Sequence, residues 1–95
     1  LYSDIDYLVL APDIENTIGN IVYWLRSAGY IWEGSEHYQG AIRIFMSWRK
    51  DNINLIVTTN KEFSRNHKRA TKLCKILNLS NKADRIAVFQ ELLYG

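Results

Sequence analysis

The hydrophobic and polar positions of this chain fall into short runs of two kinds, which predict strands and helices. Residues 3–10 alternate polar and apolar before closing on an apolar run, as a half-buried strand does. Ala11-Pro12-Asp13 predicts a helix start, because proline is tolerated in the first turn and an acid suits the positive end of a helix. From Ile14 to Leu25 apolar side chains recur at helical spacing, and Gly29 stands where such a helix would end.

The middle of the chain predicts three more strands. Residues 30–32 are a short strand candidate, and the polar residues 33–40 predict a loop. A loose alternation predicts a strand over residues 41–48. The polar residues 50–52 predict a hairpin turn, after which residues 53–58 return as the antiparallel partner.

Two helices are predicted in the C-terminal part. Thr59 and Glu62 have capping-box spacing, so we expect the first of these helices to be capped by Thr59. Its apolar stripe is Phe63, Ala70, Leu73, Cys74 and Leu77. Ser80 is the expected cap of the last helix. The residues expected to face inward there are Ala83, Ile86, Ala87 and Phe89, with Leu92 or Leu93 near the end.

These elements together predict the order β-α-β-β-β-α-α and an α+β fold, a mixed sheet with helices packed on one side. Ninety-five residues suffice for one domain, residues 1–95, with a single core. An apolar content of 47% and a single proline indicate a globular chain rather than a disordered one. No apolar run approaches the roughly 20 residues that a membrane span needs, so we expect no membrane partner.

The charge and the cysteine content limit the possible partners and the cellular location. A net charge of +2 is too small to indicate nucleic-acid binding by itself. The single cysteine, Cys74, excludes an internal disulfide and a multi-cysteine zinc site, and it favours a reducing, cytoplasmic location. The chain begins at Leu1, without a methionine and almost directly on a strand, so we expect further sequence upstream.

Two carboxylates at the head of the first strand are the most informative chemical feature. Asp4 and Asp6 are two residues apart, so both side chains point to one face of the strand while Ile5, Tyr7 and Val9 point to the other. Carboxylates held so close repel each other unless a cation lies between them or one keeps its proton. Mg²⁺ and Mn²⁺ prefer oxygen ligands, so we expect one of them to be the bound cation. The competing interpretation is a solvated strand end whose acids pair with Lys or Arg or cap a neighbouring helix.

The pentapeptide Ser3-Asp4-Ile5-Asp6-Tyr7, at the head of this order of elements, resembles the nucleotidyltransferase superfamily that includes DNA polymerase β and the tRNA CCA-adding enzymes. The resemblance covers the order of elements to about residue 58. Residues 72–89 also resemble small phage-encoded nucleotidyltransferases. That family carries a glycine turn before the strand, the paired acids on it, and a third acid on a later strand.

The resemblance implies a site that binds a divalent metal and a nucleoside triphosphate and transfers a nucleotidyl group. Carried over, Asp4 and Asp6 are catalytic metal ligands, Asn54 stands at the position of the third acid, and Ser3 contacts the nucleotide. The cofactor implied is Mg²⁺ or Mn²⁺. Two departures stand against this pattern: the glycine turn would have to precede Leu1, and Asn54 supplies an amide oxygen without charge.

Nearby acids offer only indirect replacements for the missing third acid. Asp51 belongs to the predicted turn, and Glu33 or Glu36 would substitute only if the loop folds back. A catalytically degenerate member of the family that binds a protein, as in phage–host conflict or a toxin–antitoxin pair, is therefore the alternative function. Asn54 is the feature that favours it.

A third hypothesis is a nucleic-acid-binding domain that uses the basic helix over residues 61–75. Its basic face comprises Arg65, Lys68, Arg69 and Lys72, together with Lys61 and Lys75. The competing interpretation is an ordinary solvated helix face. His67 and Cys74 on the same helix are expected to be packing residues.

The aromatic content is high for so short a chain. Trp24, Trp32 and Trp48 are equally compatible with core packing and with a surface that stacks bases or anchors a protein partner.

Overall fold

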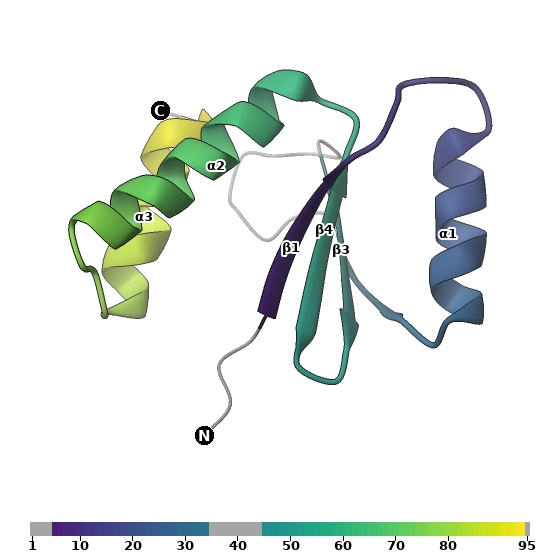
Figure 1. Cartoon of the computed structure of the whole chain (residues 1–95), viewed down its shortest axis with the longest axis horizontal. Helices are drawn as coiled ribbons and strands as arrows, with labels where there is room; N and C mark the ends of the chain where they lie inside the picture. Colours follow the sequence, from purple (N-terminus) through teal and green to yellow (C-terminus); the bar gives the residue numbers. More distant parts are fainter. Residues whose placement is uncertain (1–4, 35–44, 95) are drawn as a thin grey trace.

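The computed structural model describes residues 5–34 and 45–94, and within them the chain is α+β, with a four-stranded mixed sheet and three helices (Figure 1). The elements in chain order are β1 (Ile5–Leu10), α1 (Thr17–Ser27), β2 (Ile31–Gly34), β3 (Phe45–Lys50), β4 (Ile53–Thr58), α2 (Lys61–Ile76) and α3 (Lys82–Tyr94). This succession of strands and helices is the one that the hydrophobic pattern predicts. Asp4 and Ser3, the 41–44 part of the predicted third strand and the 35–40 part of the predicted loop lie outside the described residues.

The sheet has the spatial order β1-β4-β3-β2. β3 and β4 form the predicted hairpin, whose turn is tight enough to place Asp51 at φ 53°. β2 adds to β3 in antiparallel fashion, and β1 adds to the other side of β4 in parallel. The first strand therefore pairs with a strand more than forty residues later in the chain, and β1 and β2 are the edges of the sheet.

Helices cover both faces of the sheet, so the expectation of helices on one side is wrong. In Figure 1, α1 lies on one side of the strands, and α2 and α3 lie on the other. The physical reason is that the two central strands are apolar on both faces: Trp48 and Val57 point toward α1, whereas Phe45 and Ile56 point toward α2. A sheet with two apolar faces needs a cover on each.

The core on the α1 side is built around Trp48, which is 1% exposed. Leu25 of α1, Val57 and Ala11 are buried with it. Partly buried residues complete this cluster: Ile18, Ile21, Val22, Tyr30, Met46 and Leu55. The helical spacing of the α1 members is what the sequence predicts for a helix with one apolar stripe.

The core on the α2 side is smaller and aromatic. Phe45 and Phe63 stack with ring centroids 5.0 Å apart and planes 14° from parallel. Ile56 is buried with them, and Leu8 of β1 and Leu93 of α3 pack against the cluster. Both ends of the described chain thus meet in this second cluster.

The predicted start of α1 is wrong by several residues. The helix begins at Thr17 rather than near Pro12, because Asn16 takes a left-handed conformation with φ 69° that interrupts any earlier helical turn. Ile14, expected on the buried stripe, is therefore exposed. The predicted end is confirmed, since Gly29 follows the cap residue Ala28 with φ 90°.

The caps of α2 and α3 each fall one residue after the predicted one. Asn60, not Thr59, caps α2, and its side-chain oxygen accepts a hydrogen bond of 2.8 Å from the Phe63 backbone N–H. Asn81, not Ser80, does the same at α3, accepting from the Ala83 N–H at 2.8 Å. An asparagine side chain satisfies the open N–H groups of a first turn as well as a hydroxyl does, so spacing alone did not identify the cap.

The predicted buried stripes of α2 and α3 hold only in part. Phe63, Ala70 and Cys74 are buried as expected, but Leu77 is exposed because α2 ends at Ile76. On α3 the expected inward residues Ala83, Ile86 and Ala87 are exposed. The reason is that the second half of α3 makes the core contacts, through Phe89 against His67 and Leu93 against the aromatic cluster. Within the residues that the structure describes, no helix has the length and apolar character to span a membrane.

Candidate functional site

A row of polar side chains crosses the sheet on the face toward α2. Asp6 on β1 is the register partner of Asn54 on β4, and Asn54 is in turn the partner of Arg49 on β3. Glu33 of β2 completes the row through its ion pair with Arg49. We call these four residues the polar row. They occupy all four strands, and side chains opposite one another in a sheet point to the same face.

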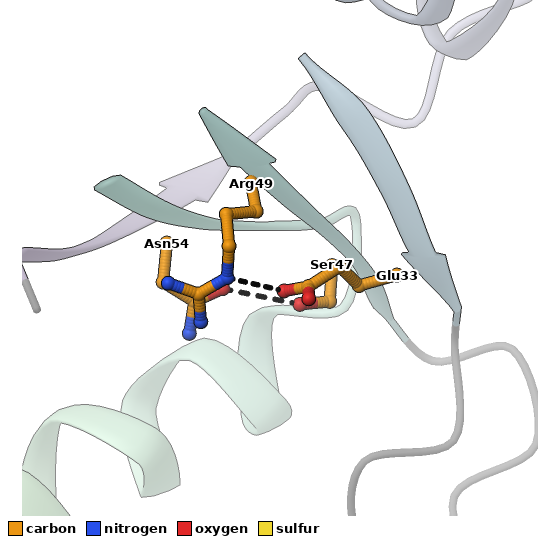
Figure 2. Close-up of polar contacts among 4 residues, drawn as sticks. All are labelled: Glu33, Ser47, Arg49 and Asn54. Carbon is orange, nitrogen blue, oxygen red and sulfur yellow. Dashed lines mark hydrogen bonds and ion pairs between the residues drawn. The ribbon is translucent and has the colours of Figure 1, made fainter. Parts of the chain in front are cut away.

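Figure 2 shows how two polar contacts fix the centre of the polar row. The Nε of Arg49 donates to Oε1 of Glu33 at 3.0 Å. The hydroxyl of Ser47, which is fully buried, donates to Oδ1 of Asn54 at 3.2 Å. The amide orientation of Asn54 is thereby set: its oxygen faces Ser47, and its other lone pair remains to accept a second donor or a cation.

Asp6 is the exposed end of the polar row. It comes from an edge strand, and its charge acts on His67 of α2, which packs above this face. His67 is buried between two aromatic rings: its centroid lies 5.8 Å from that of Phe63 and 4.9 Å from that of Phe89. Burial lowers the pKa of His67 below its ordinary 6.5, and the negative charge of Asp6 partly opposes this. His67 is thus a packing histidine, as expected.

The oxygen donors at this end of the row are few. Asp6 supplies one exposed carboxylate and Asn54 one neutral amide oxygen, while Asp4 and Ser3 lie outside the described residues. Residues 5–34 and 45–94 contain no group of three or more His, Cys, Asp or Glu side chains placed to hold a metal. Magnesium is often held by only one or two carboxylates, with water and substrate phosphates completing its shell. The donor set therefore fits a metal that arrives with phosphate rather than one held in a closed protein cage.

The other acids considered from the sequence do not join Asp6. Glu33 belongs to β2, separated from β1 by the two central strands, and it is engaged by Arg49. Asp51 stays in the hairpin turn, and Glu36 lies outside the described residues. Of the candidate ligands, the structure brings together Asp6 and Asn54.

Sequence reasoning missed Arg49 and Ser47 as members of this site. The alternation of β3 places both on the face opposite Trp48. Strict alternation of side chains over residues 45–50 would therefore have predicted that Ser47 and Arg49 share a face. Their partners were not visible in the sequence, because Asn54 and Glu33 come from different strands whose pairing is set by the whole sheet.

The tryptophans divide between core and surface. Trp48 is buried and contacts Trp32 edge-on, with centroids 5.2 Å apart, so the hypothesis that Trp48 stacks bases at the surface is wrong. Trp24 is 62% exposed on α1, away from the polar row. The basic residues of α2 are all exposed, as the helical spacing predicts: Lys61, Arg65, Lys68, Arg69, Lys72 and Lys75.

Comparison with known proteins gives no relative for this chain: no family model, no curated protein and no solved structure matches it.

Proposed function

We propose that the chain is a nucleotidyltransferase-like protein that binds a nucleoside triphosphate together with Mg²⁺ or Mn²⁺ at the Asp6 end of the polar row. The observation that carries this proposal is the register of two neighbouring parallel strands, which sets the Asp6 carboxylate beside the Asn54 amide. An exposed carboxylate beside an amide supplies part of the oxygen ligand set that a hard cation needs. The triphosphate supplies the remaining oxygens.

Each member of the row has a part in such a site. Asp6 is the charged metal ligand, and Asn54 is the neutral one, oriented by the Ser47 hydroxyl. Arg49 brings positive charge beside them, where the negative charge of a triphosphate would lie, and Glu33 fixes its position. Asp4, two residues before Asp6 on the same side of the predicted strand, would be the second carboxylate.

Nucleotide binding requires fewer functional groups than nucleotidyl transfer does. Nucleotidyl transfer needs a base or a metal-bound water to take the proton of the acceptor hydroxyl, and an amide at position 54 does not take a proton. Catalysis would then rest on the metal and the aspartates alone. We therefore propose metal-dependent nucleotide binding. If the protein is active, the reaction would be transfer of a nucleotidyl group to an acceptor hydroxyl.

Isothermal titration with ATP, CTP, GTP and UTP in Mg²⁺ and in Mn²⁺ tests the proposal. We expect metal-dependent binding that the Asp6→Asn variant loses and that Asp13→Asn keeps, since Asp13 is an exposed carboxylate in the connection before α1. Absence of binding at millimolar nucleotide, or equal binding by both variants, would reject the proposal.

A second candidate function is a catalytically degenerate copy of this kind of fold that binds a protein. The observation in its favour is a pair of large aromatic side chains on the outer face of α1, where Tyr23 is 76% and Trp24 62% exposed. Tyrosine and tryptophan are enriched among the residues that dominate protein interfaces. This candidate predicts no nucleotide binding by the folded protein, and a partner whose affinity falls when Trp24 is replaced by alanine.

A further inference from the structure

The outer face of α2 carries half of the basic residues of the whole chain. Six of the 12 Lys and Arg side chains lie within this 16-residue helix, and all six are exposed: Lys61, Arg65, Lys68, Arg69, Lys72 and Lys75. With 3.6 residues per turn, their positions fall within an arc of about 120°. We call this set the basic stripe. It lies opposite the side of α2 that carries Phe63, Ala70 and Cys74 into the core.

The six side chains of the basic stripe all carry positive charge. Within the part of the chain that the structure describes, none of the six forms an ion pair with a carboxylate. The only acid of the helix, Glu62, falls just outside the arc. The field of the stripe therefore adds along the helix instead of cancelling, although the net charge of the whole chain is only +2.

We propose that the basic stripe is a docking surface for duplex nucleic acid, which it contacts through phosphates without reading bases. The inference is independent of nucleotide binding at the polar row, because the stripe faces away from the sheet. From Lys61 to Lys75 the stripe is about 21 Å long, at 1.5 Å per residue. At 3.4 Å per base pair this length matches about six base pairs of duplex, so the cations meet a similarly spaced row of phosphates.

The chemistry of the arc favours a duplex over other polyanions. It has no aromatic side chain on which an unpaired base would stack, as single-strand binding surfaces have. A helix that binds a membrane surface keeps an apolar face for the lipid, but the apolar face of α2 is packed on the sheet and on α3. Protein interfaces have an apolar or aromatic centre, and the centre of this arc is cationic.

The test measures binding of a labelled DNA duplex and a labelled RNA duplex by fluorescence anisotropy over a range of salt concentrations. Each phosphate neutralised contributes about 0.9 to the slope of the logarithm of affinity against the logarithm of salt concentration. We expect a slope near −5 if all six cations make contact, which means roughly a thousandfold loss of affinity between about 50 and 200 mM salt.

The variant Arg65→Gln/Lys72→Gln should flatten the slope by about two. The matched control, Arg26→Gln/Lys50→Gln, removes the same number of charges from the α1 side of the molecule and should leave the slope unchanged. Circular dichroism confirms that both variants are folded. Asp6→Asn should leave duplex binding intact, so that failure of this inference and failure of nucleotide binding are separate results.

Three outcomes would overturn the inference. One is no duplex binding at about 50 mM salt, where phosphate contacts are strongest. Another is equal flattening of the slope in the two double variants, which would mean that binding depends on the net charge of the protein and not on the basic stripe. The last is binding of polyglutamate or of phosphatidylserine vesicles as tight as that of the duplex, which would assign the stripe to an acidic protein or to a membrane.

Discussion

Asp6 and Asn54 are register partners on neighbouring parallel strands, although they are 48 positions apart in the sequence. The hairpin of β3 and β4 presents Asn54 on a central strand, and β1 closes against it with Asp6 on the same face. The position that the nucleotidyltransferase resemblance would give to a third acid thus lies directly beside Asp6. The amide there is oriented by Ser47 and flanked by Arg49.

The Asn54→Asp variant is the first prediction. A carboxylate at this position adds a charged oxygen ligand next to Asp6, so we expect the Mg²⁺–nucleotide complex to bind about tenfold more tightly, which corresponds to about 1.4 kcal/mol. In the absence of metal the two carboxylates repel each other, so the variant should also be less stable than the parent until Mg²⁺ is added. Thermal unfolding with and without Mg²⁺ measures the stability, and isothermal titration measures the nucleotide affinity. Equal nucleotide affinity in parent and variant would remove Asn54 from the site.

The second prediction concerns pH and His67. Its pKa in the folded protein lies below the ordinary 6.5, because burial disfavours the charged ring. The unfolded chain therefore binds the proton more readily, so the free energy of unfolding should be at its full value above about pH 6.5 and fall as the pH drops through the interval down to the folded pKa.

Urea unfolding at successive pH values checks this dependence, and an NMR titration of the His67 ring gives its pKa directly. Asp6→Asn removes the negative charge that raises the pKa, so the His67 pKa should fall further in that variant. A His67 pKa at or above 6.5 would contradict the prediction.

The third prediction concerns the cap of α2. Asn60→Ala removes the side-chain oxygen that accepts from the Phe63 N–H and should lower the free energy of unfolding by about 1 kcal/mol. Thr59→Ala is the matched control at the residue that the sequence pattern favoured, and it should cost clearly less. Urea denaturation of the two variants decides between the caps. A larger loss of unfolding free energy for Thr59→Ala would identify Thr59 as the cap and contradict the prediction.

The fourth prediction contrasts two tryptophans. Trp48→Ala empties the centre of the core on the α1 side and should cost about 3 to 5 kcal/mol, which is a large share of the stability of a small domain. Trp24→Ala removes an exposed ring and should change the free energy of unfolding by no more than about 0.5 kcal/mol. Similar losses in both variants would mean that Trp24 is also a packing residue.

The local parts of this fold were predictable from the sequence. The bounds of β4 match the predicted 53–58, and the turn before it falls where polar residues interrupt two apolar runs. Gly29 marks the end of α1 because few other residues take its backbone conformation readily. In these places a short stretch of chain determines its own structure.

The remaining features depend on contacts between distant segments. The pairing of β1 with β4 and the cover on both faces follow from the assembled sheet, and no local pattern encodes them. The late start of α1 follows from the left-handed Asn16, which the helical spacing of Ile14 concealed. For the candidate site, the sequence supplied Asp6 and Asn54, whereas Arg49 and its partner Glu33 became visible only when β2 and β3 were side by side.

We expect a metal–nucleotide complex to bind at the Asp6 end of the polar row. Paramagnetic broadening of backbone NMR signals by Mn²⁺–ATP locates a bound metal directly. We expect the broadening to be strongest at Asp6 and Asn54, to spare the residues of α1 on the opposite face of the sheet, and to disappear in Asp6→Asn. Broadening centred elsewhere, or none at saturating Mn²⁺–ATP, would contradict it.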